Sequence, residues 1–345
     1  MRYTLIDNVQ QGERLGKHIF ASDGRILLQS GAQLTVGILS RLRHMGVQAI
    51  YIKDERVEDI EVEEVVSESV KRSTIATLKD SFHFVQSGKN IDFQSIQKSI
   101  TSIIDEVLMN HQTLLSLTDI RTEDNELFIH SVNVCIISTI LGVKVGLDRT
   151  KLQELATGAL LHDIGKILPS EKGKEDDVEN DHTWKGFNAL RKNKEISTLS
   201  AHIALTHHEH IDGSGYPRQL KDEEIHYLSK VVAIANTYDR LISKGEDNRG
   251  LYPHEACEHL LALTNVQFSH PIMWRFLRAV AFYPTGSQVK LSTNETGIVV
   301  GQHTGLPQRP IIRVFEMTGS DSGDYDVKHI DLAKETTVFI EKVLM

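Results

Sequence analysis

The chain has 345 residues, which is more than one hydrophobic core normally organises, so we expect two or three domains. Hydrophobic residues make up 40% of the chain and charged residues 25%, which is typical of folded globular proteins and excludes a disordered chain. The formal net charge of −9 excludes a general attraction to nucleic acid or to an anionic membrane. An anionic ligand would therefore be held by metal ions or by a few placed cations.

The two cysteines, Cys135 and Cys257, lie in apolar stretches without a CxxC partner, which predicts buried free thiols in a reducing compartment. The N-terminal residues lack the long apolar run of a signal peptide. The most apolar stretch, around residues 134–143, is too short to span a bilayer. We therefore expect a cytoplasmic protein without a membrane, DNA or RNA partner.

Residues 1–60 are predicted to form a small α+β domain. An acidic run over residues 55–64 at its end is typical of a solvated linker or of a helix start. The other expected elements are a hairpin over residues 18–28 with its turn at 22–24, a helix capped by Thr35 that ends at Met45 and Gly46, and a strand over residues 47–52.

Residues 61–118 are predicted to form a helical connector. Apolar residues recur there at steps of three, four and seven, as on one face of a helix: Phe93, Ile96, Ile100, Ile103, Val107 and Leu114. This face can pack on the neighbouring domain, or it can join two chains. We favour packing, because the pattern is shorter than a sustained coiled coil, and keep a homodimer through the connector helix as the alternative.

Residues 119–283 have an almost wholly helical pattern, and residues 284–345 have the pattern of short strands separated by turns. Helices are predicted over residues 126–145, 150–161, 184–192, 200–208, 228–243, 253–263 and 270–281. Strands are predicted over residues 289–291, 297–300, 310–315, 329–332 and 337–343. The predicted fold is multi-domain: an all-α helical core flanked by a small N-terminal α+β unit and a small, barrel-like C-terminal β unit.

The helical core carries a concentration of histidines. The chain has 17 histidines, and seven of them fall in less than a quarter of its length. These seven are His130, His162, His182, His202, His207, His208 and His210.

Asp163 directly follows His162 at the end of an apolar helix. Imidazole and carboxylate groups are good ligands for first-row transition metals, and an unpaired charge at this place would be costly. Lys166 lies one turn beyond Asp163 and can reach an anion held at a metal. Glu126 and His130 are four residues apart and share a helix face, although a solvent-facing pair has the same pattern. His182 alone is also consistent with a surface histidine.

His207 and His208 are adjacent on a predicted helix, where neighbouring side chains diverge by about 100°. That divergence suits two neighbouring metal ions better than one. The loop that follows can bring its backbone close to a ligand, because it is rich in glycine. Its candidate residues are Gly213, Gly215, Tyr216 and Pro217.

Asn236 and Asp239 lie one turn apart on an apolar helix. This face can close the metal site. A polar stripe on a half-buried helix is the alternative interpretation.

Together these stretches resemble the HD-GYP family of cyclic di-GMP phosphodiesterases, within the HD phosphohydrolase superfamily. The resemblance covers about residues 119–263 and includes both name-giving motifs, His162-Asp163 and Gly215-Tyr216-Pro217. It implies an HD-type helical core and two or three divalent metal ions as cofactor, with iron or manganese favoured. Imidazole and carboxylate ligation alone leaves zinc, cobalt and nickel open.

The resemblance also implies a role for particular residues. The implied metal ligands are Glu126, His130, His162, Asp163, His182, His207, His208 and the position of Asn236. Asp163 and Lys166 are the implied catalytic residues. The implied substrate contacts are Lys166, Gly213, Gly215, Tyr216, Pro217, Asp239 and Arg249.

The sequence departs from the family pattern at three places. Asn236 stands where the family usually has an aspartate ligand, and its amide brings no negative charge to a cationic cluster. In the segment that follows, only Lys244 and Arg249 remain near the positions of the family's arginines. The stretch that precedes His182 is short and acidic, which is unfavourable near a dinucleotide anion.

These observations predict a metal-dependent phosphodiesterase whose substrate partner is a cyclic dinucleotide. It would hydrolyse cyclic di-GMP to pGpG, GMP or both through a metal-bridged hydroxide, while Lys166 neutralises charge on the phosphoryl oxygens. Two alternatives stay open. One is a catalytically weak or inactive sensor or scaffold that binds metal or nucleotide, which Asn236 motivates. The other is an HD phosphohydrolase for another nucleotide.

Overall fold

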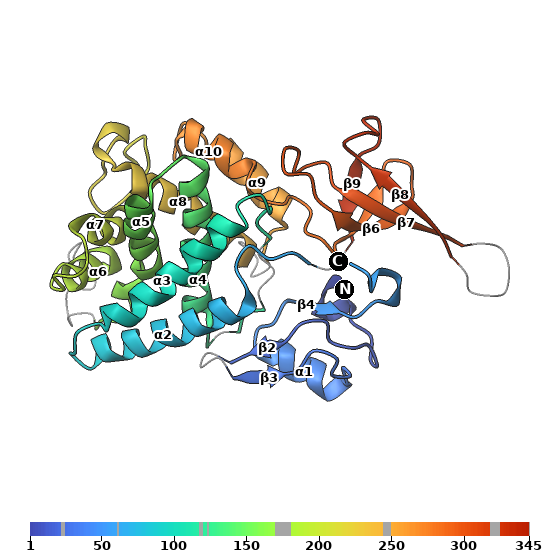
Figure 1. Ribbon diagram of the computed structural model, residues 1–345, viewed down its shortest axis with the longest axis horizontal. Coiled ribbons are helices and arrows are strands. Elements are labelled where there is room, and N and C mark those ends of the chain that lie inside the picture. Colours follow the sequence, from blue (N-terminus) through green and yellow to red (C-terminus); the bar gives the residue numbers. More distant parts are fainter. Residues whose placement is uncertain are drawn as a thin grey trace.

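The computed structural model describes residues 1–21, 25–60, 62–116, 120–122, 124–169, 181–243, 250–317 and 325–344. Figure 1 shows a large body of helices, a small α+β unit at one end of it, and a separate β-sheet that carries the C-terminus. The predicted fold class, a helical core flanked by a small α+β unit and a small β unit, is confirmed.

Two antiparallel strand pairs form the sheet part of the N-terminal unit. β1 (Arg2–Leu5) pairs with β4 (Ala49–Ile52). β2 (Ile19–Phe20) pairs with β3 (Ile26–Leu28), as the predicted hairpin requires, and the turn at residues 22–24 lies outside the described residues.

The helix of this unit begins and ends close to the predicted positions. α1 (Val36–His44) starts where the Thr35 hydroxyl accepts a hydrogen bond from the amide of Ile38. In the acidic run over residues 55–64, Glu55–Val57 forms a short 3-10 helix, and the apolar side chain of Val57 is buried.

Seven helices form most of the helical body. They are α4 (Glu126–Lys144), α5 (Arg149–Leu161), α6 (His182–Leu190), α7 (Thr198–Thr206), α8 (Tyr227–Ser243), α9 (Pro253–Ala262) and α10 (His270–Leu277). The helix α10 ends before residue 281, where we expected its end, because the backbone there pairs with another segment. The amide of Leu115 donates to the carbonyl of Ala279 at 2.8 Å, and the amide of Ala281 donates to the carbonyl of Leu115 at 2.9 Å.

The helix α4 is the central helix of this body. It is long and apolar enough to cross a membrane, but 78% of its most apolar window is buried inside the protein. The apolar character of α4 therefore reflects its place in a core. The thiol of Cys135 on this helix and that of Cys257 are buried and free, as predicted, and burial raises the pKa of Cys135 to about 12.

The connector forms two helices, α2 (Glu68–Gln86) and α3 (Phe93–Met109), that lie along the helical body (Figure 1). The apolar face of α3 is buried in the same hydrophobic core as α4 and α5. Packing within the chain, the interpretation favoured from the sequence, accounts for this face. The homodimer remains a prediction and would need another surface.

Five antiparallel strands form the C-terminal sheet, in the order β8-β7-β6-β5-β9. Their bounds are β5 (Gln288–Leu291), β6 (Thr296–Gly301), β7 (Ile311–Met317), β8 (Tyr325–Asp331) and β9 (Ile340–Val343). We expected a barrel-like unit, but β8 and β9 are the edges of this sheet and do not pair with each other in the described residues.

The sheet is attached to the N-terminal unit as well as to the helical body. The guanidinium of Arg313 on β7 donates to both carboxylate oxygens of Asp59, at 2.7 Å each. The amide of Tyr3 on β1 donates to the carbonyl of Gly286 at 3.0 Å. These contacts place the flanking units side by side.

Candidate metal centre

The carboxylate of Asp163 lies between two pairs of histidines. Its Oδ2 atom is 3.4 Å from Nε2 of His162 and 3.6 Å from Nε2 of His130. Its Oδ1 atom is 3.5 Å from Nε2 of His182 and 3.7 Å from Nε2 of His207. Each oxygen therefore faces its own group of nitrogens, an arrangement in which one carboxylate can bridge two metal ions.

The donor atoms form two overlapping sets in the described residues. The first set is His130, His162 and Asp163, and the second is Asp163, His182, His207 and His208. Within each set the donor atoms all lie within 4.8 Å of one another. Asp163 is the member that both sets share.

Four helices bring these side chains together. His130 is on α4, His162 and Asp163 follow α5, His182 begins α6, and His207 and His208 follow α7. We expected the last two on a helix, but α7 ends at Thr206 and His207 is its cap residue. Their rings lie side by side, with centroids 4.0 Å apart.

The backbone fixes which nitrogen of each ring faces the site. Nδ1 of His162 donates to the carbonyl of Ala159 at 2.7 Å, and Nδ1 of His207 donates to the carbonyl of Ala204 at 2.9 Å. A proton on Nδ1 of a neutral ring leaves a lone pair on Nε2. Nε2 of each ring therefore points toward Asp163 with a lone pair that can bind a metal ion.

His130 and His162 present two such nitrogens to each other. Nδ1 of His130 donates to Oδ2 of Asp239 at 2.7 Å, so Nε2 of this neutral ring also carries a lone pair. The two Nε2 atoms are 3.3 Å apart. Lone pairs at this distance repel unless a cation draws both, so the pair fits a metal ion.

Several buried polar atoms of these residues and of Asn236 on α8 have no hydrogen-bond partner among the described residues. They are Oδ1 of Asp163, Oδ1 of Asn236 and the Nε2 atoms of His182, His207 and His208. Buried polar groups in folded proteins are almost always paired. All of these atoms are electron-pair donors, and together they suit a divalent metal ion of the first transition row.

Burial favours the neutral form of four of the histidines, whereas the aspartate is ionised near neutral pH. Burial lowers the pKa of His130, His182 and His207, and lowers the pKa of His208 to about 2. Burial alone would raise the pKa of Asp163, but His162 and Lys166 outweigh it and hold that pKa well below its ordinary value. These are the protonation states in which such groups bind metals.

Asp239, which we expected to contact substrate, is fully buried behind His130. Its Oδ2 accepts hydrogen bonds from Nδ1 of His130 and, at 2.9 Å, from Arg121, while its Oδ1 accepts one from Asn133 at 3.1 Å. Burial opposes ionisation of Asp239, but Arg121 and His130 hold its pKa far below the ordinary value. Its contacts favour a positioning role, in which it orients the ring of His130, over contact with substrate.

Asn236 and Glu126 occupy different positions relative to the histidines. Asn236 is buried one turn before Asp239 on α8, and its Oδ1 is among the unpartnered atoms. Glu126 lies one turn before His130, but its Oε1 is 3.8 Å from Nη1 of Arg121 and it belongs to neither donor set. Their roles as metal ligands remain predictions.

Two cations stand on the solvent side of Asp163. The ammonium of Lys166 donates to Oδ2 of Asp163, and Nη2 of Arg240 is 3.7 Å from the same oxygen. Their side chains are 35% and 44% exposed, so both can meet an incoming anion. The sequence analysis missed Arg240, although its place one turn after Asn236 puts it on the face that carries the site.

The loop after His208 folds back over the histidines. A Cβ atom at Gly215 would lie 2.5 Å from the carbonyl oxygen of His208, so only glycine fits there, and Gly213 has a φ of +85°. The ring of Tyr216 stacks on His208 with centroids 4.6 Å apart and is 44% exposed. Pro217 follows in the same loop. Tyr216 thus forms part of the rim of the metal centre.

Glu209 and Arg121 form hydrogen bonds that stabilise the loop and Asp239. Neither role was predicted from the sequence. The buried carboxylate of Glu209 accepts hydrogen bonds from the amides of Arg218 at 2.7 Å and Leu220 at 2.8 Å, which fixes the loop. A glutamate directly before a glycine-rich loop could have been predicted from the sequence to accept hydrogen bonds from the backbone amides of that loop. Arg121 lies far from Asp239 in the sequence, and nothing in its local pattern indicates their ion pair.

Some predicted features lie outside the described residues. These are Lys244, Arg249 and the acidic stretch up to residue 180. Asp181, just beyond that stretch, caps α6 by accepting a hydrogen bond from the amide of Thr183 at 2.8 Å.

Comparison with known proteins assigns families to two parts of the chain. A family model described as "HD domain" matches residues 115–268, and one described as "KOW domain associated with HD domain" matches residues 288–345. The first covers the helices that carry the histidines, and the second covers the C-terminal sheet.

Several similar proteins are named as phosphodiesterases. A cyclic di-GMP phosphodiesterase of Pseudomonas aeruginosa is 28% identical over 334 residues, which cover 86% of this chain and 79% of that protein. A cyclic di-GMP phosphodiesterase of Thermotoga maritima is 34% identical over 165 residues, which cover 45% of each chain. A solved HD-GYP-type protein from Bdellovibrio bacteriovorus has a TM-score of 0.49 and 19% identity over 79% of this chain and 97% of that one.

The substitution Asp239→Asn is expected to weaken metal binding by about 10–100-fold. The asparagine amide has one acceptor oxygen and no negative charge. Its hydrogen bonds with Arg121 and His130 are therefore weaker, and the ring of His130 is held less firmly. Calorimetric titration of the chelator-treated protein with Mn²⁺ measures the change. Asp80→Asn, at an exposed position of α2, is the matched control. An unchanged Mn²⁺ affinity in folded Asp239→Asn protein would contradict the positioning role.

The stability of the metal-free protein is expected to fall as the pH decreases below about 6.5, the ordinary pKa of histidine. Burial lowers the pKa of His130, His182, His207 and His208 in the folded state, so the unfolded chain binds more protons there. Below about pH 6.5, each ring that stays neutral in the folded protein lowers the free energy of unfolding by about 1.4 kcal/mol per pH unit. Above about pH 7 the rings are neutral in both states, and the free energy of unfolding no longer depends on them.

Denaturant unfolding at pH 7.5 and 5.5, in the presence of a chelator, measures this slope. His208→Gln should reduce it, whereas His44→Gln, at an exposed position of α1, should leave it unchanged. Equal slopes for the unmodified protein and His208→Gln would refute the assignment of a neutral buried ring.

Proposed function

We propose that this chain is a metal-dependent phosphodiesterase of the HD-GYP family that hydrolyses cyclic di-GMP to pGpG, GMP or both. The observation that carries the proposal is the carboxylate of Asp163, which faces histidine nitrogens with each of its oxygens. This arrangement would suit a pair of metal ions, and sites with two metal ions are used in phosphodiester hydrolysis.

We assign the metal ions to the two donor sets that share Asp163. Iron or manganese is the proposed metal, and Asn236 and Glu126 are proposed as additional ligands. When bound, such ions supply Lewis acidity and lower the pKa of water. The chain contributes neutral imidazoles, an ionised carboxylate and the second layer of hydrogen bonds from Asp239 that keeps His130 in place.

The cations beside Asp163 supply the phosphate contacts of this proposal. Lys166 and Arg240 approach the same oxygen of Asp163 from the solvent side. A substrate phosphate at this place would exchange their contact with Asp163 for contact with its own oxygens. Charge that develops on the phosphoryl group would then be stabilised by fixed cations.

The rim residue Tyr216 supplies a contact for the nucleobase. Its ring lies over His208 and remains partly exposed, so a base can pack against it at the edge of the metal centre. The glycines at positions 213 and 215 let the loop backbone stay close to this ring.

Asn236 favours a second candidate, a sensor or scaffold that binds metal or nucleotide without efficient turnover. Its amide oxygen is buried and has no hydrogen-bond partner among the described residues, but it carries no charge. A cluster with one carboxylate fewer holds cations less tightly. The two candidates differ in turnover and not in the presence of the site.

Protein purified under anaerobic conditions is expected to contain iron or manganese and to convert cyclic di-GMP to a linear product. His162→Ala and Asp163→Ala should each reduce turnover by at least about 100-fold, because each removes a donor from the shared centre. Metal analysis and chromatography of the products measure both effects. The exposed variant His44→Ala is the control.

Three outcomes separate the candidates. Bound metal with nucleotide binding but no turnover would favour the sensor. Turnover of a different nucleotide would favour another HD phosphohydrolase. Full activity in both His162→Ala and Asp163→Ala would refute the site itself.

Asn236→Asp is expected to raise the affinity for Mn²⁺ by about tenfold, because the new carboxylate adds a charged ligand where the amide oxygen now lies. Calorimetric titration of the metal-free protein measures the change. Asn193→Asp, in the turn after α6, adds the same charge away from the donor sets and is the control. Equal shifts in both variants would mean that Asn236 does not face the metal ions.

A further inference from the structure

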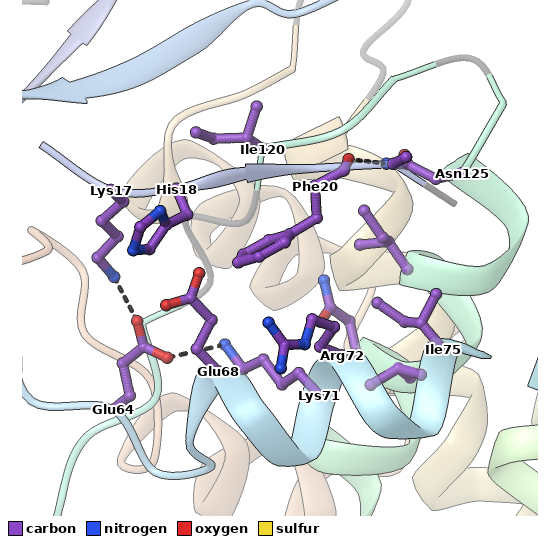
Figure 2. A pocket seen from close by; sticks show the side chains of 14 residues that line it. Lys17, His18, Phe20, Glu64, Glu68, Lys71, Arg72, Ile75, Ile120 and Asn125 are labelled. Atoms are coloured by element: carbon purple, nitrogen blue, oxygen red, sulfur yellow. Dashed lines mark hydrogen bonds and ion pairs between the residues drawn. The ribbon is translucent and has the colours of Figure 1, made fainter. Parts of the chain in front are cut away.

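A cavity lies where the N-terminal unit meets the helical body. Its volume is about 70 Å³, several times the roughly 10–15 Å³ that one water molecule needs. Figure 2 shows the segment with Lys17, His18 and Phe20, which leads into β2, on one side and the helix α2 on the other. The cavity is therefore walled by two units that fold from separate parts of the sequence.

One part of the wall is apolar. Phe20 of β2, Ile75 of α2 and Ile129 and Val132 of α4 line it. A hydrocarbon group in this space would lose its contact with water and gain stability in proportion to the area that it buries.

A second part of the wall carries charges that are already paired. Glu64 accepts a hydrogen bond from Lys17, and Nζ of Lys71 lies 3.4 Å from its other carboxylate oxygen. This cluster closes one end of the cavity (Figure 2).

Glu68 and Arg72 are different, because both project from α2 into the cavity (Figure 2) without an ion pair in the described part of the chain. They are four residues apart, a spacing at which glutamate and arginine usually pair on a helix. The guanidinium of Arg72 instead lies over the ring of Phe20, 5.5 Å from its centroid. The cavity thus offers one negative and one positive group next to an apolar wall.

We propose that this cavity binds a small zwitterion with an apolar group, of the size and charge of an aliphatic amino acid. The ligand carboxylate would pair with Arg72, its ammonium with Glu68, and its apolar group would lie against Phe20 and Ile75. Arg72 suits a carboxylate because its planar guanidinium can donate two parallel hydrogen bonds.

Asn133 connects this cavity to the metal centre. Its side chain lines the cavity, and its amide donates to Oδ1 of Asp239 at 3.1 Å. Asp239 in turn accepts the hydrogen bond from Nδ1 of His130. A ligand seated against Asn133 would act on a chain of contacts that orients His130, so its binding should change the affinity for metal. By linkage, metal should change the affinity for the ligand by the same factor.

Binding is tested by calorimetry of the full-length, metal-free protein with L-valine as the probe. 3-Methylbutanoate lacks the ammonium of L-valine, and isobutylamine lacks its carboxylate. Each analogue is expected to bind at least about tenfold more weakly than L-valine, and Glu68→Gln and Arg72→Gln should each cause a loss of similar size. Asp80→Asn, at an exposed position of the same helix, should leave the affinity unchanged.

Equal binding of 3-methylbutanoate and L-valine would overturn the zwitterion, and absence of L-valine binding would overturn the site. Binding that survives both Glu68→Gln and Arg72→Gln would also overturn the site. Circular dichroism establishes that the variants are folded. This measurement needs neither metal nor nucleotide, so its failure is distinct from failure of the proposed phosphodiesterase.

The coupling is tested by titrating Mn²⁺ with and without saturating L-valine. We expect a change of at least about threefold in Mn²⁺ affinity, and Asn133→Ala, titrated at L-valine concentrations that saturate this variant, should abolish the change. Equal Mn²⁺ affinities with and without L-valine, or a change that persists in Asn133→Ala, would overturn the coupling through Asn133.

Discussion

The carboxylate of Asp163 is buried among imidazole nitrogens that carry lone pairs, and charge in such a place is stable only when an opposite charge meets it. Lys166 and Arg240 supply part of that charge from the solvent side. The remaining donor atoms face one another without partners, which is why they fit metal ions. Because the donors come from α4 through α7, the packing of these helices decides whether the centre exists at all. The hydrophobic core shared by α3, α4 and α5 therefore holds the donor residues in position and also stabilises the protein.

Behind the donors lies a layer of hydrogen bonds centred on Asp239. It holds His130 on one side and accepts from Arg121 and Asn133 on the other. Asn133 also lies at the border with the N-terminal unit, since it lines the cavity that this unit helps to form. A change in the packing of the N-terminal unit thus has a short physical route to one metal donor. The contact between the N-terminal unit and the helical body could therefore influence the orientation of His130.

The sequence predicted most helices and the donor residues for the same reason: both depend on local spacing. Helical periodicity predicts the helices. His162-Asp163 and His207-His208 are short motifs whose residue types by themselves indicate metal binding. Asp239 was harder to interpret, because a polar residue one turn from Asn236 can face either substrate or another side chain. Its three partners come from residues more than a hundred positions away, and no local pattern contains that information. Arg121 was missed on the same ground.

The amino-acid sequence by itself predicted the class of fold from its periodicity. Its resemblance to the HD-GYP family predicted the candidate metal donors and the missing carboxylate at Asn236. Only the tertiary structure decided that the two oxygens of Asp163 face different histidines, that Asp239 orients His130, and that Arg240 stands beside Lys166. It also decided that the face of α3 is filled from within the chain and that a charged cavity lies against α2. The physical reason is that each of these features is a distance between helices, and distances between helices are set by packing.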